Sequence, residues 1–151
     1  MLKYLIINAA VLMLTISTSQ AMNAWDHPLF TAMRQVESYN GRELVGDHGR
    51  SRGIYHIQDC YIKDVNRVYG TRFKLSDRDD PVKAHRIVRL YLAHYCRVYT
   101  KLTGKPATCE ILARIHNGGP FGWRKKVTIK HWRRVERAMR TFVASEKVRA
   151  K

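Results

Sequence analysis

Residues 28–57 read PLFTAMRQVESYNGRELVGDHGRSRGIYHI, and this stretch decides the fold. Pro28 suits the first position of a helix, and apolar residues then recur at helical spacing. A Tyr-Asn-Gly turn signal follows, so we expect the helix to end near Ser38 and to carry Glu37 in its last turn. The glycine-rich run 46–53 lies between two short apolar pieces, which predicts a small β-hairpin.

Beyond this stretch the pattern is helical. We expect a helix over 60–69, a long helix from Pro81 to a Gly-Lys-Pro break, a shorter helix after a Thr108 cap and a last helix from Thr128. No repeat or linker separates these segments, and the length suits one domain. The sequence therefore predicts an α+β fold, mainly α, in a single domain over residues 22–151.

Residues 1–21 have the pattern of a secretory signal peptide. Lys3 gives a positive start, an apolar stretch runs from Tyr4 to Ile16, and small and polar residues lead to Ala21. A buried helix or a membrane anchor is the alternative, but the apolar stretch is short for a span. Cleavage after Ala21 makes the expected location secreted, either extracellular or periplasmic.

The chain is strongly basic, with 28 Lys and Arg against 12 Asp and Glu and a net charge of +16. Loss of residues 1–21 removes only Lys3, which leaves 27 basic and 12 acidic residues and a charge of +15. Such a protein is attracted to anionic surfaces, including bacterial walls, anionic membranes and extracellular nucleic acid. Its hydrophobic content of 45% argues against a disordered basic tail.

Two carboxylates are the candidates for catalysis. At Glu37 the negative end of the helix dipole and nearby apolar surface raise the pKa of a carboxyl group, as a general acid needs. Asp47 lies ten residues on in a Gly-flanked loop, where water keeps an Asp charged. Glycosidic bond cleavage uses one protonated and one charged carboxylate. Taken singly, these residues are better explained by a solvated surface position for Glu37 and a turn position for Asp47.

Other chemistries have weaker signals. The seven histidines form no HExxH pattern and no CxxC is present, so we expect no metal and no cofactor. No phosphate-binding glycine motif or GxSxG motif occurs. Basic and aromatic residues alternate over 130–134, as on nucleic-acid surfaces, but a solvated helix face with Trp132 in the core explains them too. We therefore expect no nucleic-acid partner.

The chain has three cysteines, too few for a densely cross-linked mini-protein. Cys96 and Cys109 flank the connection between two expected helices, and a disulfide between them is expected in an exported chain. A loop of this size contributes on the order of 3 kcal/mol in the chain-entropy account. Cys60 is left over, either as a small buried apolar residue or as a thiol that pairs with another chain.

The helix end QVES, the run GDHGRSRGIYHI over 46–57 and, most specifically, ARIHNGGP over 113–120 together resemble the lysozyme superfamily. They are most similar to invertebrate-type (destabilase-like) lysozymes. The first half also resembles goose-type lysozymes and lytic transglycosylases, which share a Glu-Ser helix end and a Gly-rich hairpin. The resemblance covers residues 29–135 and implies a lysozyme-like fold with the hairpin beside an active-site cleft.

The resemblance also implies roles for single residues. It makes Glu37 the general acid and Asp47 the second carboxylate. It assigns the sugar cleft to Ser51, Tyr55, His56, Asp59, His116, Asn117 and Gly118. The chain departs from the family at His56, where Gln is usual, and in its small number of cysteines.

The expected function is that of a secreted muramidase, which hydrolyses the β-1,4 bond between N-acetylmuramic acid and N-acetylglucosamine in peptidoglycan. We expect a monomer whose only partner is the bacterial cell wall. Two alternatives remain open. One is a lytic transglycosylase that uses Glu37 alone, and the other is a non-enzymatic cationic antibacterial protein on the same scaffold.

Overall fold

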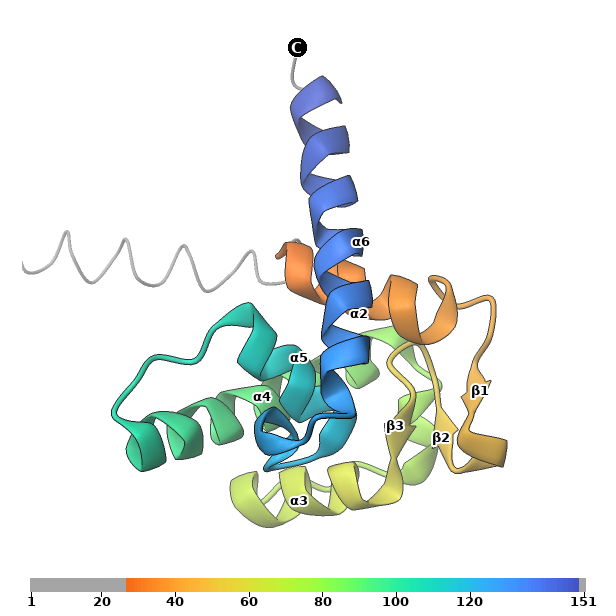
Figure 1. Cartoon of the computed structure of the whole chain (residues 1–151). Helices are drawn as coiled ribbons and strands as arrows, with labels where there is room; N and C mark the ends of the chain where they lie inside the picture. Colours follow the sequence, from red (N-terminus) through yellow and green to blue (C-terminus); the bar gives the residue numbers. More distant parts are fainter. Residues whose placement is uncertain (1–26, 150–151) are drawn as a thin grey trace, which may run out of the picture.

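The computed structural model describes residues 27–149, so the expected signal peptide lies outside the described residues (Figure 1). The helices are α2 (Pro28–Ser38), α3 (Asp59–Tyr69), α4 (Pro81–Thr103), α5 (Cys109–Gly118) and α6 (Thr128–Arg149). Short 3-10 helices are η1 (Asp47–Gly49), η2 (Leu75–Arg78) and η3 (Gly122–Arg124). The strands β1 (Val45–Gly46), β2 (Ser51–Arg52) and β3 (Ile57–Gln58) form one antiparallel sheet in that order. The predicted class, mainly helical with a little β-structure, is confirmed.

The helices enclose one hydrophobic core. Helix α2 packs on α6, α5 packs on α6, and α3 packs on α4. The side chains of Met33, Ile87 and Ile115, from three different helices, are fully buried there. Tyr61 of α3 stacks on Tyr91 of α4 with ring centroids 3.5 Å apart. Burial of each such side chain stabilises the fold by roughly 1.5–3 kcal/mol, so these contacts fix how the helix ends meet.

The helix boundaries follow the local signals. Asp80 caps α4 by accepting hydrogen bonds from the backbone N–H groups of Val82 and Lys83, with Pro81 in the first position. Gly104 ends α4 in the left-handed conformation. Thr108 caps α5 through the backbone N–H of Ile111. Each of these boundaries was expected from sequence.

The sheet differs from the expected hairpin. β1 pairs with β2, so that Val45 lies opposite Arg52, and β3 adds a third strand on the other side of β2. The chain turns at Gly53, whose φ is +78°. A Cβ at Gly53 would lie 1.8 Å from the carbonyl oxygen of Arg78 in η2, so only glycine fits this close approach. The segment just after Gly53 therefore forms a turn, where a strand was expected.

The expected disulfide between Cys96 and Cys109 is wrong. Both residues are free, partly buried thiols, and Cys60 is a free, exposed one. Helix α4 continues from Cys96 to Thr103, about 10 Å at 1.5 Å per residue, before the connection begins. A disulfide needs Cα atoms within about 7 Å of each other. Cys96 therefore does not flank the connection, and Cys109 packs against the core instead.

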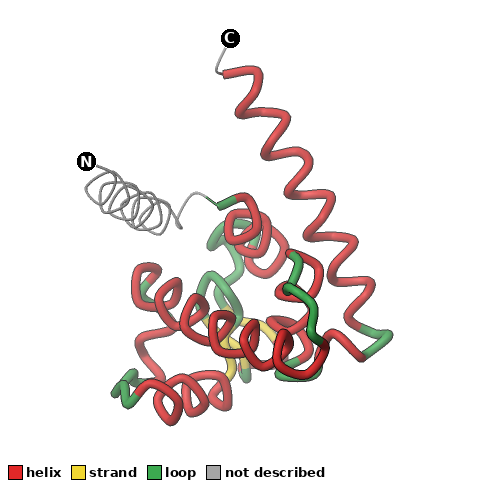
Figure 2. The backbone as a smooth tube through the Cα atoms, turned by 90° about the vertical axis from the view of Figure 1, so that its left-hand side faces the viewer, coloured by secondary structure: helices red, strands yellow, loops and turns green. Residues whose placement is uncertain are grey.

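Helix α6 has two different halves. Its first half packs on α2 and α5, while its C-terminal half extends beyond the body of the fold (Figures 1 and 2). Val143 and Val148 in that half are exposed. Among residues 27–149 no helix has the length and the apolar composition that crossing a membrane requires.

Candidate active site

A cleft of about 490 Å³ opens between the C-terminal end of α2, the sheet and the start of α6. Both candidate carboxylates line it, together with five of the predicted substrate-binding residues, which are Ser51, His56, His116, Asn117 and Gly118. A second groove, of about 510 Å³, lies between α2 and α6, but neither an acidic residue nor a histidine lines it. Of these two, only the first cleft is lined by carboxyl and imidazole groups, which can donate a proton as general acids.

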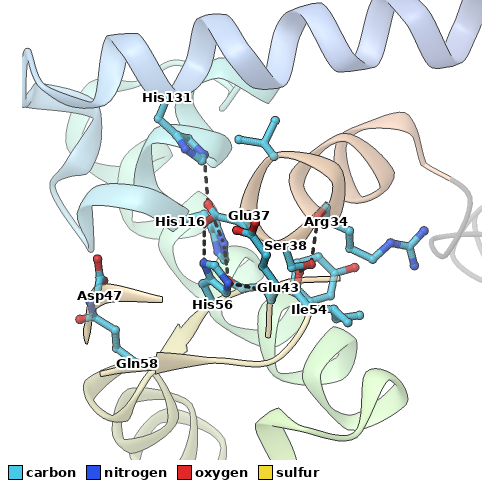
Figure 3. Close-up of polar contacts among 12 residues, drawn as sticks. Arg34, Glu37, Ser38, Glu43, Asp47, Ile54, His56, Gln58, His116 and His131 are labelled. Carbon is cyan, nitrogen blue, oxygen red and sulfur yellow. Dashed lines mark hydrogen bonds and ion pairs between the residues drawn. The ribbon is translucent and has the colours of Figure 1, made fainter. Parts of the chain in front are cut away.

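The last turn of α2 places Glu37 at the cleft. The next residue, Ser38, is fully buried and anchors the helix end to the sheet region. Its Oγ donates a hydrogen bond of 2.9 Å to the carbonyl oxygen of Ile54 (Figure 3). It also accepts a hydrogen bond of 2.9 Å from the backbone N–H of Gly41. The Gln-Val-Glu-Ser helix end thus fixes the glutamate relative to the sheet.

Glu37 has the properties of a general acid. Its side chain is 14% exposed, and burial raises its pKa from 4.5 to about 7. The positive charge of Arg134 acts in the opposite direction, and the negative charge of Asp47 adds to the increase. The pKa of Glu37 therefore lies in the neutral range, where proton donation by a general acid is most effective.

Three histidines surround this carboxyl group (Figure 3). Nδ1 of His56 lies 3.7 Å from Oε2, while Nε2 of His116 and Nε2 of His131 lie 3.8 Å and 3.5 Å from Oε1. Burial lowers the pKa of His116 to about 3 and that of His131 to about 4. Both rings are therefore neutral at neutral pH and do not draw the proton from Glu37 as a cation would.

Hydrogen bonds assign the tautomer of His116. Its Nε2 lies 3.1 Å from the carbonyl oxygen of Tyr55, and a carbonyl can only accept, so Nε2 carries the hydrogen. Its Nδ1 then accepts from the hydroxyl of Tyr61, at 3.0 Å. The ring is held on both sides and forms a rigid wall of the cleft.

Asp47 lies in a different setting. It is exposed, at the start of η1, and its φ of +49° is in the left-handed region. Its Oδ2 accepts a hydrogen bond of 2.8 Å from the side-chain amide of Gln58 (Figure 3). The cleft therefore brings a buried, proton-carrying glutamate and a solvated aspartate to one space.

Two predicted substrate residues do not line this cleft. Tyr55 is 0% exposed and belongs to the core, where its hydroxyl meets Nδ1 of His85 at 2.7 Å. Asp59 starts α3 on the outer surface, where it pairs with Arg78 at 3.2 Å. The expectation that the Tyr55 side chain contacts sugar is thus corrected, and Tyr55 supports His116 through its carbonyl group. Asp59 pairs with Arg78, and its contact with sugar stays a prediction.

The cleft also contains residues that the sequence did not single out. His131 of α6 lies beside Glu37, Gln58 of β3 contacts Asp47, and Tyr61 of α3 contacts His116. Two sequence signals included His131: the basic and aromatic run over 130–134, which is typical of nucleic-acid surfaces, and the similarity of residues 131–135 to invertebrate-type lysozymes. Cys60, whose state was left open, lines the same cleft as a free thiol.

A mainly helical fold, a small antiparallel sheet and a cleft with a buried glutamate and a second carboxylate define the class of lysozyme-like proteins. No protein-family model matches the chain. The chain is 30% identical to a lysozyme of Ostrea edulis over 134 residues, which is 85% of this chain and 93% of that protein. It also matches an inhibitor-bound lysozyme of Meretrix lusoria, with a TM-score of 0.57 and 33% identity over 74% of this chain and 88% of that one. The chain belongs to the lysozyme family.

Other relatives are matched over shorter stretches. A lysozyme of Magallana gigas is 39% identical over 85 residues, which cover 56% of this chain. An invertebrate-type lysozyme of Caenorhabditis elegans is 36% identical over 90 residues, or 54% of this chain. The alignments span 58% and 62% of the length of these two proteins.

Proposed function

We propose that the protein cleaves the β-1,4 bond between N-acetylmuramic acid and N-acetylglucosamine in peptidoglycan. The observation that carries the proposal is the mostly buried Glu37, with a pKa of about 7, in a cleft that also holds Asp47. Membership of the lysozyme family supports peptidoglycan as the substrate.

The two carboxyl groups divide the reaction between them. Glu37 transfers its proton to the glycosidic oxygen, so that the leaving sugar departs as an alcohol. Asp47 provides the negative charge that stabilises the oxocarbenium-like transition state. Ser51 and Asn117 line the cleft as hydrogen-bonding groups for the sugar. No step needs a metal or a cofactor.

The charge supports a wall-bound substrate. The chain without residues 1–21 keeps a charge of +15, which concentrates the enzyme on anionic bacterial walls. Added salt therefore weakens this attraction and lowers lysis. The proposed location is outside the cytoplasm, following the signal-like residues 1–21.

Lysis of a bacterial wall suspension by Glu37→Gln and by wild type tests the proposal. Glutamine keeps the shape of the side chain but has no proton to transfer, so we expect a loss of about 10²- to 10⁴-fold. Glu136→Gln is the matched control, because Glu136 pairs with Arg140 on the surface of α6, outside the cleft. Equal lysis by Glu37→Gln and wild type would contradict the proposal.

Analysis of the released muropeptides separates the two reactions that a single acid supports. A reducing end shows hydrolysis, whereas an anhydro end shows transglycosylation. Bacterial killing that persists in Glu37→Gln would instead favour a non-enzymatic cationic protein.

A further inference from the structure

His56 faces the catalytic carboxyl group in a fixed tautomer. Its Nε2 lies 2.9 Å from the backbone carbonyl oxygen of Glu43, and since a carbonyl only accepts, Nε2 carries the hydrogen of the neutral ring. Nδ1 then has its lone pair free, and this atom lies 3.7 Å from Oε2 of Glu37. A protonated carboxyl group thus faces a basic nitrogen.

The backbone is shaped to place this ring. His56 has a φ of +46°, in the left-handed region that residues other than glycine rarely adopt. On the neighbouring strand β1, a Cβ at Gly46 would lie 2.7 Å from Nδ1 and 2.9 Å from Cε1 of His56. The strained turn and the missing side chain together admit the imidazole at this position, and strained backbone of this kind concentrates at functional sites.

The other two histidines around Glu37 differ from His56 in the oxygen they face and in burial. His116 and His131, from α5 and α6, face Oε1, whereas His56 faces Oε2. Their side chains are 3% and 7% exposed, compared with 17% for His56. The remaining charged and titratable groups that act on the carboxyl group or lie near it are Arg134 of α6, Asp47 of η1 and Tyr61 of α3. Of the three histidines, His56 has the most access to water.

We propose that His56 is a positioning residue for the catalytic acid and that Oε2 of Glu37 and Nδ1 of His56 share one proton. When the proton crosses, the O–H bond breaks and the N–H bond forms, which leaves a carboxylate beside an imidazolium with no change in total charge. A movement of about 1 Å brings these two atoms from 3.7 Å to hydrogen-bond distance in the sugar-free protein, which is the state that the test measures. This inference rests on the proposed function, because it concerns the acid that the function uses.

The pair has a measurable consequence for pH dependence. Two sites that share a proton release the last one at a higher pH than either site alone. The limb on which activity falls with rising pH therefore lies at higher pH in wild type than in a variant without the imidazole. If the proton is shared, the ¹³C signal of the Glu37 carboxyl group is expected to change in two steps in wild type.

The test compares wild type with His56→Gln. The glutamine amide can still donate a hydrogen bond to the Glu43 carbonyl, but it cannot take up or release a proton in this pH range. We measure the pH profile of kcat/KM and the ¹³C NMR titration of the Glu37 side-chain carboxyl. We expect the alkaline limb to move to lower pH and the two-step titration to become a single step. His94→Gln, on α4 and outside the cleft, is the matched control and keeps the wild-type profile.

Gly46→Ala provides a second route to the same change in titration, since the new methyl group would lie 2.7 Å from both Nδ1 of His56 and Oγ of Ser51 and displaces the ring without removing it. We expect the same change in titration, and no further change when the two substitutions are combined, because they break one interaction. An unchanged limb and a two-step titration in folded His56→Gln would overturn the inference. If wild type lacks lytic activity, the proposed function fails, while the NMR titration still decides whether the proton is shared.

Discussion

The two ends of the cleft treat a carboxyl group in opposite ways. Glu37 lies in the last turn of a helix with a side chain that is 14% exposed, and three imidazole rings surround it. Asp47 lies on an exposed turn of the sheet, where the amide of Gln58 is its hydrogen-bond partner. The same chemical group is kept as a proton donor in one place and as a negative charge in the other.

The difference shows that packing, more than position in the chain, divides the roles. Burial is the largest cause of the raised pKa of Glu37, and the charge of Asp47 adds to it. The aspartate therefore helps to keep the glutamate protonated while remaining in water itself. Arg134 limits this effect, so the pKa of about 7 is a balance between burial and two opposite charges.

Among the substitutions that compare the two carboxyl groups, Asp47→Asn should have the largest effect on activity. It removes the charge that we propose stabilises the transition state, so we expect kcat/KM to fall by about 10²- to 10³-fold. It also removes the charge that raises the pKa of Glu37, so the alkaline limb of the remaining activity should move to lower pH. Asp79→Asn is the control, since Asp79 pairs with Arg52 away from the cleft. A limb that stays in place would show that the two carboxylates do not interact.

Glu37→Gln should stabilise the fold in a pH-dependent way. The unfolded carboxyl group ionises near pH 4.5 and the folded one near pH 7, so ionisation destabilises the native state as pH rises through this window. Glutamine does not ionise, so it is not destabilised in this way. The unfolding free energy of Glu37→Gln relative to wild type should therefore increase from pH 4.5 to 7, and the difference should reach about 3 kcal/mol above pH 7. Urea unfolding at several pH values measures the difference.

Asp47→Asn, the corresponding substitution at the other end of the cleft, is the control for this pH-dependent effect on stability. Asp47 is exposed, so Asp47→Asn should change the unfolding free energy by less than about 0.5 kcal/mol at any of these pH values. If the difference in unfolding free energy between Glu37→Gln and wild type stayed constant from pH 4 to 8, burial would not be destabilising the charged form of Glu37.

Features that depend on neighbouring residues were predictable from sequence. The Asp80 cap, the Gly104 end of α4 and the end of α2 at Ser38 each follow from a few adjacent residues. The direction of the Glu37 pKa shift also follows from a helix end beside apolar surface. The burial that dominates it does not, because His116 and His131 come from helices far along the chain.

The sequence-based predictions that were wrong share a physical cause, because each depends on contacts between segments that are distant in the sequence or on the full length of a helix. Tyr55 was expected in the cleft, but its ring is drawn into the core and only its carbonyl group supports the site. The sheet turns where Gly53 meets η2, a contact that local propensity does not contain. The Cys96 to Cys109 disulfide was inferred from proximity in sequence, and the length of α4 removes it.

Arg134→Gln should have the smallest effect and the opposite sign to Asp47→Asn. The guanidinium donates a hydrogen bond of 3.1 Å to the carbonyl oxygen of Val36, next to Glu37, and its charge lowers the pKa of the glutamate. Its loss should move the alkaline limb of kcat/KM to higher pH by a fraction of one pH unit. Arg137→Gln, one turn further along α6, is the control with the same loss of charge.

The double variant of Arg134→Gln and Asp47→Asn tests whether the effects of the two charges on the pKa of Glu37 cancel. If the pKa of Glu37 is a balance of burial and two opposite charges, the two shifts should largely cancel and return the limb toward its wild-type position, while kcat/KM stays low. If the alkaline limb of the double variant lay at the same pH as that of Asp47→Asn, Arg134 would act only through its hydrogen bond to the end of α2 and not through its charge. The position of the limb and the height of the profile therefore report separately on the protonation of Glu37 and on the charge of Asp47.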